Sequence, residues 1–178
     1  MLRIAMGTVV LSLVAAPAAT AREVVQFASE ASPGTVLVNT QERRLYLVLG
    51  DGTAIRYRVA VGKAGKQWVG TTQIARKHVS PAWSPPEEVR RDIPDLPAVI
   101  PGGSPRNPMG AGALTLAGGE YAIHGTNRPN SIGTFASYGC IRMYNEDILD
   151  LLERVHVGTP VIVLQGTPGQ TRSDRNRL

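Results

Sequence analysis

The sequence predicts a mainly β domain with one clear helix near its C-terminal end. Short runs rich in Val, Ile, Tyr and Thr recur along residues 35–124, and Gly, Pro and Asp-Gly turn signals separate them. One stretch with helical spacing of its apolar residues begins at Asn145. Because no internal repeat or long linker divides the chain, we expect a single folded domain.

The chain opens with a segment typical of a secretory signal. Arg3 precedes an uncharged apolar run at residues 4–16, and the tripeptide ATA at 19–21 has the small-x-small pattern of a cleavage site. A retained anchor is the alternative, but the run is shorter than the roughly 20 apolar residues that span a bilayer. We therefore expect cleavage after residue 21, export to the periplasm or cell envelope, and no transmembrane anchor in the mature protein. Residues 22–34 then form an N-terminal lead.

The sequence between the expected signal and the C-terminal tail predicts mainly β-strands. A hairpin turn is expected at Asp51-Gly52, and the run TAIRYRVAV after it alternates in the way of a half-buried strand. The strands are expected at residues 35–39, 43–49, 53–61, 68–74, 113–116, 121–124 and 161–164.

Residues 79–108 are rich in proline and should form a long irregular loop, with one helical turn at 86–91. A loop of this length inside a compact domain usually shapes a functional site.

The predicted helix has conventional start and stop signals. Asn145 is expected as its N-cap, and the acidic residues Glu146 and Asp147 suit the positive end of the helix dipole. Its apolar stripe consists of Ile148, Leu152 and Val155. Gly158 and Pro160 should end it.

The charge of the chain is mildly basic, with a formal net charge of +5. The basic residues do not form a stripe of the kind that binds nucleic acid, so no nucleic-acid partner is expected. The basic end, residues 166–178, is expected to be a disordered tail.

Cys140 is the only cysteine. Exported domains use cysteines mostly as disulfides, and one cysteine cannot form a disulfide within the chain. The alternatives are a buried inert thiol, an intermolecular bridge or a reactive nucleophile.

The position of His124 favours the interpretation of Cys140 as a reactive nucleophile. It ends an expected strand, and the polar, Gly-containing loop up to Cys140 can fold back toward it. A nearby imidazole and the N-terminal end of the following helix would favour the thiolate. The N–H groups of Gly139 and Cys140 are candidates for an oxyanion hole. His78 and His156 suit solvated positions, and no spacing predicts a metal site.

The sequence motifs around His124 and Cys140 make the functional signal more specific. IHGTN at 123–127 and SYGCIRM at 137–143 resemble the L,D-transpeptidase (YkuD-type) catalytic domain family, whose pattern is H-G followed by S-x-G-C-[IVL]-R-[ML]. WSPP at 83–86, NPMGAGAL at 107–114 and VGTPVIVL at 157–164 look like the same family. The resemblance covers residues 35–165, which we expect to be the catalytic domain.

The resemblance implies a mixed β-sheet or sandwich with a short helix after the catalytic cysteine. It implies that Cys140 is the nucleophile and His124 the general base. Ser137 and Gly139 would shape the turn, and Arg142 would support the site or contact a substrate carboxylate or carbonyl. No metal or other cofactor is implied.

The implied partners are a peptidoglycan stem tetrapeptide as donor and an amine as acceptor. The cysteine would release the terminal D-Ala and form a thioester. A stem diamino acid would then give a 3–3 cross-link, or a lipoprotein lysine would attach a protein to the wall. An L,D-carboxypeptidase or other hydrolase with the same acyl-enzyme, and a non-catalytic wall-binding protein, are the alternatives. Two positions depart from the family: Tyr138 replaces a frequent histidine, and Gly112 replaces a frequent arginine.

Overall fold

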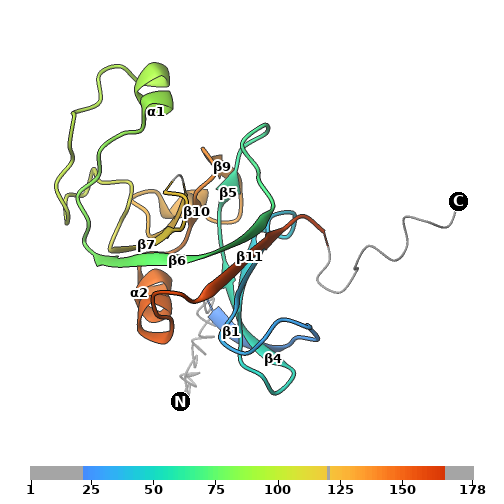
Figure 1. Cartoon of the computed structure of the whole chain (residues 1–178). Coiled ribbons are helices and arrows are strands. Elements are labelled where there is room, and N and C mark those ends of the chain that lie inside the picture. The colour runs from blue at the N-terminus through green and yellow to red at the C-terminus, as the bar shows by residue number, and fades with distance from the viewer. Residues whose placement is uncertain (1–21, 120, 167–178) are drawn as a thin grey trace, which may run out of the picture.

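The computed structural model describes residues 22–119 and 121–166. The expected signal peptide (1–21) and residues 167–178 of the expected tail lie outside the described residues. Within the described part the chain is mainly β, as predicted (Figure 1). The strands are β1 Arg22–Gln26, β2 Val36–Asn39, β3 Arg44–Val48, β4 Thr53–Arg58, β5 Val61–Gly62, β6 Gly70–Val79, β7 Gly112–Leu116, β8 Ala122–His124, β9 Phe135–Ser137, β10 Ile141–Arg142 and β11 Pro160–Leu164. The helices are α1 Glu87–Asp92 and α2 Asn145–Arg154, with a 3₁₀ turn at Pro129–Ser131.

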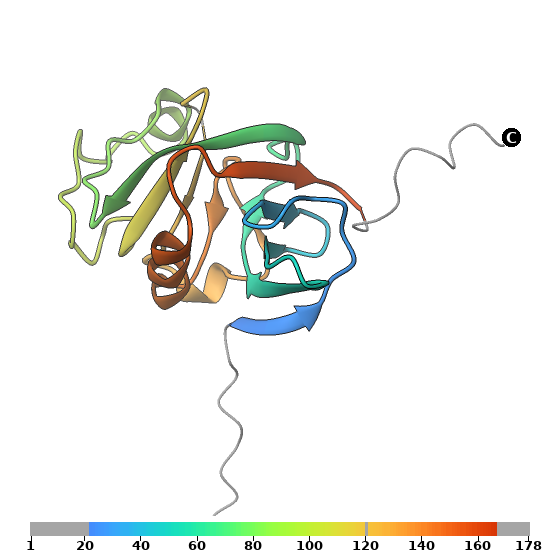
Figure 2. The ribbon, with the colours of Figure 1, turned by 60° about the horizontal axis from the view of Figure 1, so that its bottom comes forward.

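Nine strands form one mixed sheet in the order β1-β4-β3-β2-β11-β6-β7-β8-β10. β11 runs parallel to β2 and β10 parallel to β8, while the other neighbours are antiparallel. β5 and β9 pair separately, in parallel. In Figure 2 the blue-to-teal strands β1–β4 make up one half of the molecule, and the green and yellow segments around β6 and β7 make up the other.

The long strand β6 joins the two halves. Its first residues pair with β11, and its later residues pair with β7 after a register shift between Ile74 and Arg76. The strand expected at 68–74 therefore starts at Gly70 and continues to Val79. The polar stretch Arg76–Lys77–His78 gave no strand signal, because the ladder with β7 and not an apolar pattern holds it extended.

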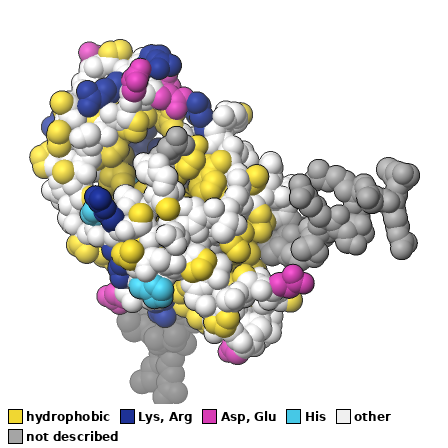
Figure 3. All heavy atoms as spheres, in the orientation of Figure 1, with side chains coloured by type: hydrophobic (Ala, Val, Ile, Leu, Met, Phe, Trp, Pro, Cys, Tyr) yellow, Lys and Arg dark blue, Asp and Glu magenta, His cyan; other side chains and the backbone are white. Residues whose placement is uncertain are grey.

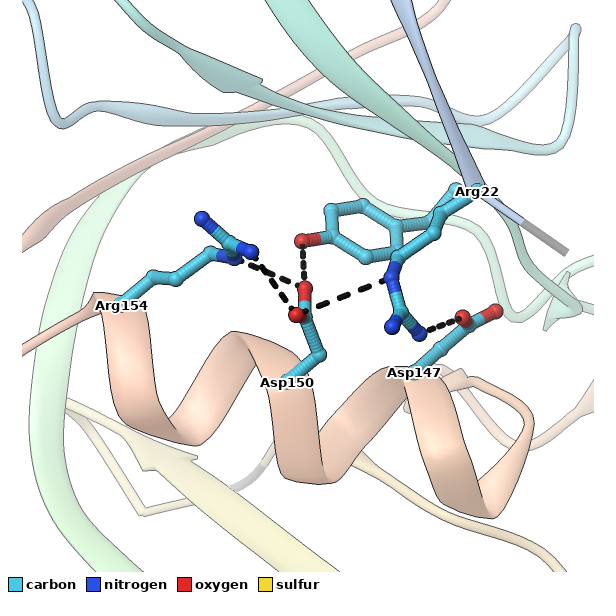
Figure 4. A network of polar contacts seen from close by, with 5 residues as sticks. Arg22, Asp147, Asp150 and Arg154 are labelled. Carbon is cyan, nitrogen blue, oxygen red and sulfur yellow. Dashed lines mark hydrogen bonds and ion pairs between the residues drawn. The ribbon is translucent and has the colours of Figure 1, made fainter.

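The hairpin β3–β4 forms where it was expected. Gly52 has a φ of +77°, and the Asp51 carboxylate accepts the N–H of Thr53 at 3.1 Å. The N-terminal lead brings an unpredicted strand, because β1 pairs with β4 and places Arg22 opposite Tyr57. A charged network ties this strand to α2 (Figure 4). The guanidinium of Arg22 lies 3.4 Å from Asp147 and 3.6 Å from Asp150.

Helix α2 buries its apolar stripe in the main core, as predicted. Ile148, Leu152 and Val155 pack there with Leu151 and with apolar residues of β2–β8 and β11. Gly112 of β7 packs on this helix, and a Cβ at Gly112 would lie 2.5 Å from Leu152 Cδ1. A side chain at position 112 would therefore require the Leu152 side chain to shift. Within the described residues, no helix has the length and apolarity needed to cross a bilayer.

Candidate active site

The pairing of β8 with β10 brings the predicted site residues together. His124, the last residue of β8, is only 4% exposed. The parallel register places Ile141 beside Ile123 and Arg142 beside His124. Cys140 immediately precedes β10, so the parallel register places it beside Ala122, the first residue of the short strand β8 that ends at His124.

The loop that carries Cys140 back is fixed by backbone hydrogen bonds. The N–H of Gly133 donates to the Val59 carbonyl at 3.1 Å, and the N–H of Lys63 donates to the Ser137 carbonyl at 2.9 Å. These bonds hold the segment before Cys140 against the β4–β5 region. The short strands β9 and β10 that result were not predicted, because two- and three-residue strands leave no periodic signal in a sequence.

Ser137 and Gly139 shape the turn before the cysteine. The buried Ser137 hydroxyl donates to the Cys140 carbonyl at 2.5 Å and accepts the Gly139 N–H at 3.1 Å. Gly139 has a φ of +119°, and a Cβ there would lie 2.4 Å from Tyr121 Cε1. Position 139 therefore requires glycine. Its N–H is already engaged by Ser137, so the expectation that it is an open oxyanion donor is wrong for this conformation.

Trp68 supports the same turn from the side. Its indole N–H donates to the Gly139 carbonyl at 2.9 Å, and its ring stacks on Tyr121 with centroids 4.8 Å apart. Both rings pack against the main core. Trp68 thus fixes the turn before Cys140.

His124, Cys140, Ser137 and Arg142 all line one cleft of about 430 Å³. The long loop 79–108 shapes this cleft, as predicted. Its contributing residues are Trp83, Pro86, Glu88, Val89 and Pro108. The remaining lining residues are Gly65, Lys66, Gln67, Met109, Tyr121 and Tyr138.

Helix α1 lies at one side of the cleft and is bound to the other side by polar contacts. Lys66 forms an ion pair with Glu88, and Lys63 lies 3.6 Å from Asp92. The Tyr138 hydroxyl also donates to Asp92, and the Lys63 ammonium lies 3.8 Å from the centre of the Tyr138 ring. Figure 3 shows charged side chains of both signs gathered at the top of the molecule, over α1.

The imidazole of His124 is neutral at neutral pH. Burial and the charge of Arg142 lower the pKa of His124 to about 4, although the carbonyls of Gly125 and Pro108 act in the opposite direction. Nδ1 lies 2.7 Å from the Gly125 carbonyl. Because a carbonyl can only accept, the Gly125 contact favours the tautomer with hydrogen on Nδ1 and the lone pair on Nε2. The ring can therefore accept a proton at Nε2.

Cys140 is half-buried, and burial raises the pKa of its thiol. The N–H of Ala122 and the charge of Arg142 act in the opposite direction. The expectation that the surroundings favour the thiolate is therefore wrong for this conformation. Helix α2 begins only at Asn145, and β10 lies between Cys140 and this helix along the chain.

The charge of Arg142 acts on both His124 and Cys140. Burial lowers the pKa of its guanidinium, and its Nε has no hydrogen-bond partner among the described residues. A buried donor without a partner is costly, and this atom is shielded from solvent.

Sequence reasoning mistook one residue next to the site. Asn145 was expected as the N-cap of α2, but Tyr144 occupies that position and Asn145 is the first helical residue. The Asn145 side chain accepts hydrogen bonds from two loops instead. The charged rim formed by Lys63, Lys66, Glu88 and Asp92 was also not anticipated, because only the fold brings these exposed residues to one place.

Comparisons with known proteins agree with this geometry. The model of the family described as "L,D-transpeptidase catalytic domain" (YkuD) matches residues 33–163. The protein named "Probable L,D-transpeptidase YbiS" of Escherichia coli (strain K12) is 42% identical over 135 residues, which cover 71% of this chain and 43% of that protein. The chain thus spans less than half the length of this curated relative.

Solved structures show the same fold. L,D-transpeptidase 3 from Mycobacterium tuberculosis superposes with a TM-score of 0.57 at 16% identity, covering 73% of this chain and 60% of that one. A structure described as "a Probable carnitine operon oxidoreductase caia from Brucella melitensis" has a TM-score of 0.54 at 40% identity, covering 80% of this chain and 92% of that one. The match to the family model over most of the described residues decides the assignment, and the chain belongs to the L,D-transpeptidase catalytic domain (YkuD) family.

Proposed function

We propose that the protein is an exported L,D-transpeptidase that acts on peptidoglycan stem tetrapeptides through a thioester on Cys140. The observation that carries this proposal is the cleft in which His124, Cys140 and Arg142 meet. Its rim, with Lys63 and Lys66 facing Asp92 and Glu88, suits a peptide substrate that carries both amino and carboxylate groups.

Acylation begins from a neutral pair. The Nε2 lone pair of His124 takes the proton of the Cys140 thiol while the sulfur attacks the carbonyl carbon of the third stem residue. The Gly125 carbonyl, 2.7 Å from Nδ1, stabilises the imidazolium that forms. When the tetrahedral intermediate collapses, the bond to the terminal D-Ala breaks. The leaving amine takes the proton back from Nε2.

The developing oxyanion needs hydrogen-bond donors. The Gly139 N–H is engaged by Ser137, so the N–H of Cys140 is the donor we assign from this turn. Arg142 lines the cleft, and its guanidinium suits a carboxylate or carbonyl oxygen of the donor peptide.

The second half-reaction transfers the acyl group. An acceptor amine attacks the thioester carbonyl, His124 takes one amine proton, and the Cys140 sulfur leaves and recovers that proton. An amide forms and the enzyme is regenerated. A water molecule in place of the amine would give hydrolysis.

The test is mass spectrometry of the products formed from a stem tetrapeptide with and without a diamino-acid-containing acceptor stem. Transpeptidation predicts release of D-Ala and a cross-linked product whose amount rises with acceptor concentration. A carboxypeptidase would release D-Ala and leave a free tripeptide at every acceptor concentration. A wall-binding protein would bind the peptide and release nothing.

A further inference from the structure

Asn145 joins two segments that meet behind His124. Its Oδ1 accepts the N–H of Ala111 at 3.0 Å and the N–H of Thr126 at 3.0 Å. Ala111 ends the loop before β7, and Thr126 lies two residues after His124. One side-chain oxygen on α2 therefore holds both segments.

The junction has no room for larger residues. A Cβ at Gly110 would lie 2.2 Å from the Asn145 Oδ1 and 2.3 Å from the Thr126 nitrogen. A Cβ at Gly125 would lie 2.3 Å from the same oxygen. Two glycines in facing segments thus let both backbones approach the Asn145 side chain closely.

The same two segments hold the imidazole. Gly125 supplies the carbonyl that lies 2.7 Å from Nδ1 of His124, and Pro108 supplies the second carbonyl that acts on the ring. The loop of Pro108 is anchored independently by the buried Asn107, whose amide donates to the Pro81 and Pro101 carbonyls at 2.8 and 3.0 Å. Asn145 is the side chain that ties this anchored loop to the segment after His124.

We propose that Asn145 is a positioning residue for the catalytic histidine. Asn145 accepts hydrogen bonds from the N–H groups of Ala111 and Thr126. These bonds fix the Gly125 carbonyl against Nδ1 of His124, and this contact keeps the lone pair on Nε2. Asn145 touches neither substrate nor the reacting atoms and acts through the backbone. The kinetic test of this role rests on the proposed function, because it measures acylation of Cys140. The test by the His124 tautomer does not.

The direct readout is the tautomer of His124, measured by ¹⁵N NMR. In a His78→Gln, His156→Gln background, His124 is the only remaining histidine. The background protein should show hydrogen on Nδ1 and an unprotonated Nε2. Asn145→Ala, which removes the hydrogen bonds to Ala111 and Thr126, should give a mixture in which a substantial fraction carries hydrogen on Nε2. Asn145→Asp keeps an oxygen acceptor and should retain the Nδ1–H form.

The kinetic readout is acylation of Cys140 by a stem tetrapeptide. Asn145 is exposed, so water can replace some of its function and the loss should be moderate. We expect Asn145→Ala to acylate about tenfold more slowly, the equivalent of roughly one to two hydrogen bonds. Asn145→Asp should recover most of the rate. If the alanine variant does not fold, Asn145→Ser keeps a residue favoured at helix N-termini and is too short to reach both loops.

The matched control is Asn39→Ala. Asn39 is buried and also makes two hydrogen bonds, to the Gly166 carbonyl at 2.6 Å and from the Glu42 N–H at 3.1 Å, but it does not line the cleft. Its loss should lower stability and leave the His124 tautomer unchanged. The proposal is overturned if Asn145→Ala or Asn145→Ser keeps the Nδ1–H tautomer, or if Asn145→Asp loses it. An unreactive wild type with the expected tautomers would refute the proposed function and leave the positioning role standing.

Discussion

The Tyr138 hydroxyl donates a hydrogen bond to the Asp92 carboxylate, which joins the segment of Cys140 to helix α1 across the cleft. The family resemblance implies a frequent histidine at this position, and in this chain Tyr138 makes a structural contact instead. The contact is made at the exposed rim, together with Lys63.

Tyr138→Phe should therefore be a mild variant. It keeps the ring beside Lys63 and loses only the hydrogen bond, so acylation should slow by less than about tenfold, or roughly 1.4 kcal/mol. His124→Ala removes the base and should slow acylation by about 10² to 10⁴. The measurement is the acylation rate of both variants with a tetrapeptide. Equal losses would mean that Tyr138 takes part in proton transfer.

The ion pair between Lys66 and Glu88 should influence donor binding more than chemistry. Glu88→Lys places two cations across the cleft, so KM for the tetrapeptide should rise severalfold with little change in kcat. The double variant Lys66→Glu, Glu88→Lys restores an ion pair and should restore KM. Both residues are partly exposed, so the effect should shrink at high salt.

A pair within α1 provides the control for this experiment. Arg91 and Glu87 are both strongly exposed and neither lines the cleft. Reversing Arg91 to Glu should leave KM unchanged. If KM of the double variant at 66 and 88 stays as high as KM of Glu88→Lys, the ion pair does not determine donor binding.

The protonation state of Cys140 can be measured by alkylation with iodoacetamide. Because burial raises the pKa of the thiol, the alkylation rate should remain low at neutral pH and rise only above about 8.5, the ordinary thiol value. A resting thiolate–imidazolium pair would instead give fast alkylation that hardly changes between acidic and neutral pH. That second profile would contradict the neutral pair described above.

The carboxyl group of Asp147 should make the free energy of unfolding decrease as the pH rises. Its carboxylate is buried, one oxygen lies 3.4 Å from Arg22, and the other has no hydrogen-bond partner among the described residues (Figure 4). Burial raises the pKa of Asp147 to about 6, above its ordinary 3.8. The folded protein therefore holds a proton that the unfolded chain has released. This costs stability as the pH rises through the interval between these two values.

Asp147→Asn removes that cost. Its free energy of unfolding relative to wild type, from urea titrations, should increase from pH 4 to pH 8. Asp150→Asn is the control of opposite sign, since Arg154 and Tyr57 lower the pKa of Asp150 and its charge stabilises the fold above the unfolded pKa. That variant should lose stability relative to wild type as the pH rises to about 5, with little further change up to pH 8. The same pH trend in both variants would contradict this account of the network.

Much of the fold could be predicted because its strands are local and periodic. The hairpin at Asp51-Gly52, the strands ending at His124 and Leu164, and the apolar stripe of α2 all follow from patterns that neighbouring residues create. β1 and the polar end of β6 were missed or misplaced. Their extended form depends on partners distant in the sequence, β4 and β7.

The composition of the site could be predicted, but its electrostatics could not. Cys140, His124 and Arg142 stand in a recognisable pattern, and the cleft contains all three. The direction of the thiol pKa was misjudged, because the burial of Cys140 is set by packing that no local pattern encodes. Asn145 was misassigned for a similar reason. A good capping residue in the sequence turned its side chain to two loops that only the fold brings near.

The central claim is that Cys140 forms a covalent acyl-enzyme with a stem tetrapeptide, and intact-protein mass spectrometry tests it most directly. Wild type mixed with the tetrapeptide in the absence of an acceptor should gain the mass of the acyl tripeptide, located on Cys140, as D-Ala is released in equal amount. Cys140→Ala should gain no mass and release no D-Ala. Release of D-Ala by Cys140→Ala at the wild-type rate would contradict the account.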